Sequence, residues 1–220
     1  EYDMEVLGSG SCGVASTADG GLLIVGATSS APTVGLSDIC LTKTNADGNI
    51  IWSKTYGSTT DDHGYLVAES PLDSSIFING ISGTESEALF MKVDKNGVFQ
   101  WATTLTTDAD YRPGSIKAYP DGSCVFSSEA DGGSVNRLGF VHLSANGTVI
   151  EKYDISGGQY NYARGAVIWA SDGNYVSAYS QNLNSTTYPE LYLKKITPAG
   201  TMIFNNGIVG SGYDFAFDLL

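Results

Sequence analysis

The strongest candidate for chemistry in this 220-residue chain is the short run Asp61-Asp62-His63. Carboxylates beside an imidazole can hold a metal ion or act as a general base. The run lies in a turn-rich segment between two strand patterns, and Asp110 and Asp214 occupy corresponding positions elsewhere. Aspartates in such segments accept hydrogen bonds from loop amides. We therefore expect capping here, and the sequence predicts no catalytic residue, no metal site and no cofactor.

The remaining chemical motifs are incomplete. His142 takes a position that lysine holds in the other copies of a repeat described below, so we expect it to be structural. No Gly-x-Ser-x-Gly elbow is followed by a plausible Asp and His. The cysteines Cys12, Cys40 and Cys124 are too few and too scattered for a disulfide framework or a zinc site. A glycosidase or lyase needs two carboxylates at a set separation, and a sequence does not show that separation.

Charge and composition exclude several classes of function. The chain carries 24 acidic and 11 basic residues, a net charge of −13. This balance argues against binding to nucleic acid, whose phosphates require clustered Lys and Arg. It argues equally against an anionic membrane surface, and no apolar stretch approaches the roughly 18 residues of a membrane-inserted helix. The 27 glycines and 13 tyrosines favour short strands joined by turns.

Two turn signals repeat along the chain at intervals of about 50 residues. The first turn ends in a glycine, at Gly48, Gly97, Gly147 and Gly200. The second contains an aspartate, at Asp19, Asp73, Asp121 and Asp172. An aromatic residue follows the glycine in three copies, whereas Glu151 takes its place in the third copy. Because both signals keep the same period, the chain consists of four copies of one unit.

Each copy predicts four strands, because Asp and Gly tolerate the backbone conformations that tight hairpin turns need. In the first copy the predicted strands are Gly13–Thr17, Leu22–Gly26, Asp38–Thr44 and Ile50–Tyr56. Repeated four-stranded units of this length indicate radially arranged blades, with a stacked solenoid as the main rival. We therefore expect an all-β fold, a small β-propeller of four four-stranded blades.

The predicted domain covers residues 1–220, with repeats at about 9–61, 62–110, 111–161 and 162–214. Residues 3–8 match the last strand of an earlier unit, and residues 215–220 match the first strand of a further one. Such an extra blade would be shared between the two termini or with another chain, because an unpaired strand edge is a docking template. The predicted assembly residues are Met4, Glu5, Val6, Leu7, Phe215, Phe217 and Leu219. The predicted partner is another copy, in a homo-oligomer or polymer.

The repeat resembles the seven-bladed-propeller-type repeat of bacterial secreted and surface proteins. The resemblance rests on Asp38–Lys43, Asp47-Gly48, Trp52, Tyr56-Gly57 and Asp61-Asp62 in the first copy, and it extends over essentially the whole chain. The chain departs from that family in having four full copies and not seven. The resemblance implies an extracellular or cell-surface propeller, usually without enzymatic activity.

Two sequons, at Asn146 and Asn184, are candidate glycosylation sites. The main functional prediction is a non-enzymatic extracellular structural module, assembling into a surface layer, appendage or filament through edge strands. The alternative is an adhesion propeller that binds glycan or a surface protein. Its ligand face would carry aromatic residues near the inter-blade loops, namely Tyr65, Tyr111, Tyr160, Tyr162 and Tyr213. A secreted glycosidase or lyase is the second alternative.

Overall fold

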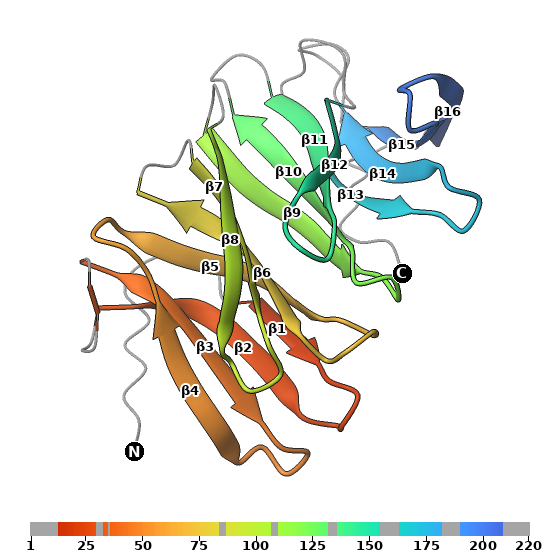
Figure 1. Cartoon of the computed structure of the whole chain (residues 1–220). Helices are drawn as coiled ribbons and strands as arrows, with labels where there is room; N and C mark the ends of the chain where they lie inside the picture. The colour runs from red at the N-terminus through yellow and green to blue at the C-terminus, as the bar shows by residue number, and fades with distance from the viewer. Residues whose placement is uncertain are drawn as a thin grey trace. The chain divides into compact units, whose positions relative to one another are not determined.

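The structure is a computed structural model that describes residues 13–29, 33–34, 36–83, 87–106, 110–131, 136–154, 163–181 and 190–208. This part of the chain contains sixteen β-strands and no helix (Figure 1). The described residues accordingly include no helix with the length and hydropathy needed to cross a membrane. The all-β prediction is confirmed.

The strands form four antiparallel sheets, each of four strands in chain order. The first sheet contains β1 (Gly13–Ser16), β2 (Leu22–Thr28), β3 (Asp38–Thr44) and β4 (Ile50–Tyr56). The second contains β5 (Asp62–Glu69), β6 (Ile76–Ser82), β7 (Glu87–Val93) and β8 (Phe99–Thr106). The third contains β9 (Asp110–Ala118), β10 (Cys124–Asp131), β11 (Asn136–Leu143) and β12 (Val149–Asp154). The fourth contains β13 (Ala163–Trp169), β14 (Tyr175–Gln181), β15 (Glu190–Ile196) and β16 (Met202–Ile208).

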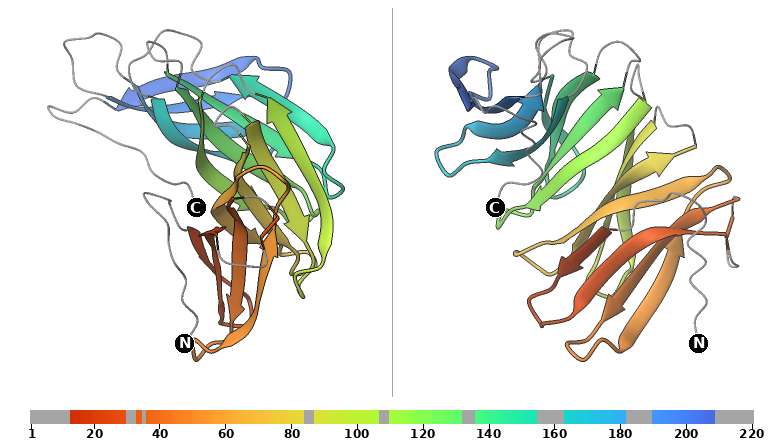
Figure 2. Two further views of the ribbon diagram at one scale, coloured as in Figure 1. Left: turned by 90° about the vertical axis from the view of Figure 1, so that its left-hand side faces the viewer. Right: turned by 180° about the vertical axis from the view of Figure 1, so that it is seen from behind.

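The four-stranded unit predicted from the repeat is therefore confirmed, because the strands form four sheets of four consecutive strands each. In the first copy β3 and β4 have the predicted bounds, whereas β2 continues two residues further, to Thr28. The chain divides into two compact units. The first two sheets belong to the first unit and most of the last two belong to the second (Figure 2).

Burial differs between the strands of a sheet, as two-sided packing requires. In β6 the residues Ile76–Ile81 are all buried, and β7 is buried from Ala88 to Val93. In β8 and β12, the fourth strands of their sheets, partly buried and exposed residues alternate. Strands covered on both faces read as continuous apolar runs, and strands covered on one face alternate.

The core of the first unit joins its two sheets. Leu23 and Leu41 from the first sheet belong to one buried cluster with Ile76, Ile78 and Met91 from the second. The two sheets thus pack face to face through aliphatic side chains. In the second unit, β10 packs against β13, and the rings of Phe140 and Tyr175 lie 4.3 Å apart.

A lysine–aspartate pair explains the repeated turn aspartate. Lys43 Nζ lies 2.8 Å from Asp19 Oδ1, and the same pair recurs as Lys92 with Asp73 and as Lys195 with Asp172. In each case a lysine of the third strand reaches the turn between the first two strands. The third copy has His142 at the lysine position, where it is buried and its Nδ1 lies 2.8 Å from the hydroxyl of Tyr175.

The four repeated turn glycines share a positive φ, and aromatic side chains of the fourth strand cover three of them. Trp101 covers Gly147, the turn glycine of the next copy, and its Nε1 donates a hydrogen bond to Ala145 O at 3.0 Å. A Cβ on Gly147 would meet the indole at 2.7 Å. In the copy where Glu151 replaces the aromatic, Tyr153 covers the next turn glycine instead. Tyr153 is two residues further along β12 and therefore on the same face of the strand.

Candidate functional site

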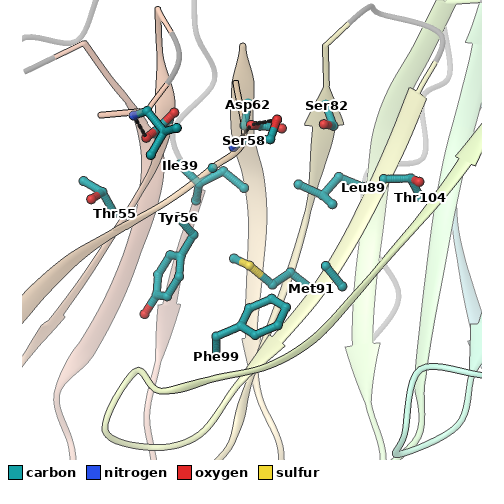
Figure 3. Close-up of a pocket in the computed structure, with 14 residues that line it drawn as sticks. Ile39, Thr55, Tyr56, Ser58, Asp62, Ser82, Leu89, Met91, Phe99 and Thr104 are labelled. Carbon is teal, nitrogen blue, oxygen red and sulfur yellow. Dashed lines mark hydrogen bonds between the residues drawn. The ribbon is translucent and has the colours of Figure 1, made fainter. Parts of the chain in front are cut away.

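A cavity of about 510 Å³ lies between the first and second sheets of the first unit (Figure 3). Its walls come from β3 and β4 on one side and from β7 and β8 on the other. Its volume falls within the range of about 300–1,000 Å³ that small-molecule sites occupy. The lining residues are Val34, Asp38, Ile39, Thr55, Tyr56, Gly57, Ser58, Asp62, Ser82, Leu89, Met91, Phe99, Ala102 and Thr104.

Asp62 lines this cavity from the first residue of β5 and is only 2% exposed. Its Oδ2 accepts hydrogen bonds from the backbone N of Ser58 at 2.7 Å and from Ser58 Oγ at 2.9 Å. The loop between β4 and β5 is thus held by the side chain of Asp62, the residue that follows it. Two donors on one oxygen fix the orientation of the carboxylate.

Asp38 lines the same cavity from the first residue of β3 and is 1% exposed. Its Oδ2 accepts a hydrogen bond from the backbone N of Val34 at 2.8 Å, so it closes its own loop as Asp62 does. Gly57 follows β4 and lies directly against this carboxylate, because a Cβ on Gly57 would overlap Asp38 Oδ1. A glycine at position 57 therefore lets the loop that leads to Asp62 pass beside Asp38.

Aromatic and aliphatic side chains line the rest of the cavity. Figure 3 shows Tyr56, Met91 and Phe99 grouped away from Asp62 and Ser58. The hydroxyl of Tyr56 donates a hydrogen bond to Gly97 O at 2.8 Å. Burial raises the pKa of this phenol above its usual value, so it stays protonated as a donor.

This combination of groups suits a carbohydrate. Aromatic rings and aliphatic carbons pack on the apolar faces of sugar rings, and hydroxyls and carboxylates bind their hydroxyl groups. Thr55, Ser82 and Thr104 supply side-chain hydroxyls to the cavity wall. Two carboxyl groups in one cavity are also the machinery of glycoside hydrolysis, in which one protonates the leaving oxygen and the other acts as nucleophile or base.

A second cavity of the first unit, about 500 Å³, lies around the Lys43–Asp19 pair and Trp52. Lys43, Asp19 and Glu69 in its lining already have partners. Lys43 Nζ donates to Asp19 Oδ1 and to Thr44 O, and Glu69 accepts a hydrogen bond from the backbone N of Ala18. The lysine hydrogen bond lowers the pKa of the Asp19 carboxyl below its usual range. This cavity therefore holds a structural ion pair.

The run Asp61-Asp62-His63 does cap loops, as the sequence indicates. Asp61 Oδ1 accepts a hydrogen bond from the backbone N of Ser37 at 3.0 Å, and Asp62 holds Ser58. His63 Nε2 lies 2.7 Å from Ser37 Oγ. The described residues contain no group of three or more His, Cys, Asp or Glu side chains placed to hold a metal ion.

The predicted ligand-face and modification residues are placed only in part. Tyr65 is half-buried on β5, with its ring 6.4 Å from that of His63. Tyr111 belongs to β9, and Asn146 is exposed in the turn between β11 and β12. The other predicted residues lie outside the described part of the chain, namely Tyr160, Tyr162, Tyr213, Asn184, Met4, Glu5, Val6, Leu7, Phe215, Phe217 and Leu219. Their roles stay predictions.

Sequence reasoning missed the pairing of Asp38 with Asp62. Asp38 was recognised only as part of the repeat. The sequence does offer one signal, because each aspartate is the first residue of a strand after a loop that contains Gly, Ser and Thr. That signal identifies two capping residues, but it does not say that their loops meet at one cavity.

No protein-family model matches the sequence, and no curated protein matches it. Solved structures do match its fold. The α-L-arabinofuranosidase Arb93A from Fusarium graminearum superimposes with a TM-score of 0.58 at 13% identity, over 91% of this chain and 66% of that enzyme. The NanB sialidase from Streptococcus pneumoniae superimposes with a TM-score of 0.52 at 14% identity, over 78% of this chain and 29% of the sialidase. A puromycin hydrolase superimposes with a TM-score of 0.57 at 13% identity, over 94% of this chain and 33% of the hydrolase.

The chain therefore has a β-propeller-like fold and spans about two thirds or less of the length of these enzymes. The comparisons overturn the prediction of a non-enzymatic structural module in a surface layer, appendage or filament, because the fold is shared with glycoside hydrolases. The physical reason for the error is that the two carboxylates come from separate loops. Their convergence depends on how the sheets pack. The resemblance to the seven-bladed-propeller-type repeat stays a prediction.

Proposed function

We propose that this chain is a glycoside hydrolase of the propeller type, with its four sheets as four successive blades. One observation carries the proposal: two buried carboxyl groups, Asp38 and Asp62, share one cavity with the rings of Tyr56 and Phe99. The fold shared with an arabinofuranosidase and a sialidase supports it. A glycan substrate also suits the extracellular or cell-surface location predicted above.

The two carboxyl groups take different roles in this proposal. Asp62 acts as nucleophile or base, because Ser58 fixes its carboxylate through two hydrogen bonds to Oδ2. Asp38 supplies the proton to the glycosidic oxygen. The rings of Tyr56 and Phe99 hold the neighbouring sugar.

The lining of the cavity favours a neutral sugar. Among the described residues that line it, none is Lys, Arg or His, whereas two are aspartates. A carboxylated sugar would meet the Asp62 carboxylate without a basic partner, and like-charge contacts oppose binding. We therefore expect neutral glycosides to be preferred over sialosides and uronides.

The test is hydrolysis of a panel of neutral and acidic aryl glycosides and polysaccharides by three variants and the wild type. Asp38→Asn and Asp62→Asn should each lower kcat/KM at least about 100-fold. Asp61→Asn is the matched control, because Asp61 does not line the cavity and an amide oxygen can still accept from Ser37. Absence of turnover on every substrate, or equal turnover by all four proteins, contradicts the proposal. Binding of a glycan without turnover would instead support a glycan-binding propeller.

A further inference from the structure

We propose that Ser37 and His63 form a nucleophile–base pair that transfers acyl groups, on the face of β5 opposite the carboxylate cavity. The carrying observation is the distance of 2.7 Å between Ser37 Oγ and His63 Nε2. A serine hydroxyl becomes a useful nucleophile when an imidazole within about 2.6–3.2 Å can take its proton. Neither residue lines the cavity that holds Asp38 and Asp62.

Strand geometry separates this pair from the carboxylates. Successive side chains of a strand point to opposite faces. Asp62 and His63 are the first two residues of β5, and the first is buried while the second is half-buried. Ser37 and Asp38 are likewise adjacent in sequence, with Ser37 directly before the first residue of β3. The two starts of β3 and β5 therefore place carboxyl groups on one side and the Ser–His pair on the other.

The backbone around Ser37 is held in place on both sides. Its N donates to Asp61 Oδ1 at 3.0 Å, and its carbonyl accepts from the backbone N of Asp62 at 2.9 Å. Both contacts come from the strand start that also carries His63. A hydroxyl fixed against its base in this way needs little rearrangement to react.

The pair is open to a substrate. Ser37 and His63 are both partly exposed, and Leu36, directly before the serine, is 82% exposed. The half-buried ring of Tyr65 lies 6.4 Å from the imidazole, which gives an apolar neighbour for an acyl group. A small O-acyl ester is the class of substrate that these features suit.

The reaction balances without a cofactor. With the hydrogen of His63 on Nδ1, Nε2 accepts the Ser37 proton as Oγ attacks the ester carbonyl and an acyl–oxygen bond forms. The alcohol leaves when the ester C–O bond breaks, and it takes that proton from the imidazolium. Water then gives a proton to Nε2 as its oxygen attacks the acyl carbonyl. The acyl–Oγ bond breaks, Oγ takes that proton from the imidazolium, and the carboxylic acid is released.

The experiment is labelling of the full chain with a fluorophosphonate, followed by mass spectrometry of each serine. Ser53 is the matched comparison within the same protein, because its Oγ lies 2.9 Å from the Thr42 hydroxyl and has no imidazole partner. Ser37 should react at least about 100-fold faster than Ser53, as general-base assistance provides. Equal rates at the two serines overturn the proposal without any variant.

Two substitutions complete the test. Ser37→Ala should abolish the fast labelling and the release of nitrophenol from nitrophenyl acetate. His63→Gln keeps a polar side chain but removes the base, so it should lower the labelling rate about 100-fold. An unchanged rate in His63→Gln would mean that the hydrogen bond only holds the loop. Ser53→Ala should leave both measurements unchanged.

Discussion

The backbone N of Asp62 donates a hydrogen bond to the backbone O of Ser37 at 2.9 Å. This contact ties the start of β5 in the second sheet to the residue before β3 in the first sheet. It places Asp38 and Asp62 at one cavity and brings Ser37 against His63. Both proposed sites therefore depend on one junction between two repeats.

Gly57→Ala tests the steric demand at that junction. The added Cβ would overlap the Asp38 carboxylate, so either the loop or Asp38 must shift. Overpacking of this kind costs about 1–3 kcal/mol, and glycoside turnover should fall with it. The free energy of unfolding in urea and kcat/KM are the measurements.

Gly26→Ala is the control for that change, because no atom within 4 Å would meet a Cβ at Gly26. Its stability and turnover should stay close to those of the wild type. If Gly57→Ala behaved like Gly26→Ala in both assays, the close approach of residue 57 to Asp38 would matter neither for stability nor for turnover.

Trp101 tests the link between successive repeats. Trp101→Ala removes the cover over Gly147 and the hydrogen bond to Ala145 O, and it should cost about 1–3 kcal/mol for this half-buried ring. Trp101→Phe keeps a ring without the N–H and should cost about 1 kcal/mol. Val98→Ala, at an exposed position of the preceding hairpin, should be neutral. A loss no larger in Trp101→Ala than in Val98→Ala would show that the indole does not join the repeats.

The lysine–aspartate pairs predict a dependence of stability on pH. Hydrogen bonds from Lys195 and Asn174 lower the pKa of Asp172 from 3.8 to about 2. An aspartate that is more acidic in the folded state stabilises the fold above its unfolded-state pKa, and this contribution disappears as pH falls through the folded value. The urea midpoint of the wild type should therefore exceed that of Asp172→Asn at neutral pH. The difference should vanish between about pH 4 and pH 2.

Lys195→Met should reduce the same pH-dependent difference, because it removes the largest cause of the lowered Asp172 pKa and leaves the hydrogen bond from Asn174. Lys95→Met changes a lysine at an exposed turn and serves as the control. A difference between wild type and Asp172→Asn that is constant from neutral pH to pH 2 would show that the pair does not couple folding to protonation.

The repeat allowed the four four-stranded antiparallel sheets to be predicted because its signals are local. A turn glycine such as Gly48, with a φ of 81°, determines a hairpin by its own conformational freedom. The spacing of four such turns then indicates four similar sheets. The replacement of the missing aromatic by Tyr153 was not predictable in the same way, because it depends on which face of β12 meets the next turn.

The site could not be predicted from the sequence, because it depends on tertiary packing and not on local signals. Asp38 and Asp62 belong to different repeats, and each looks like a loop cap when its own segment is considered alone. Only the packing of β3 and β4 against β7 and β8 forms the cavity that they share. The separation of two carboxyl groups is a property of tertiary structure, so the predicted absence of an enzyme had no sound basis in the sequence.

The most direct test of the central claim is a crystal structure of the Asp62→Asn variant with the neutral oligosaccharide that it binds most tightly. We expect a sugar ring in the cavity, with its glycosidic oxygen within hydrogen-bond distance of Asp38 and its apolar face against Tyr56 or Phe99. An oligosaccharide bound elsewhere on the chain, with the cavity between the two sheets left free of sugar, would contradict the proposed glycoside hydrolase site.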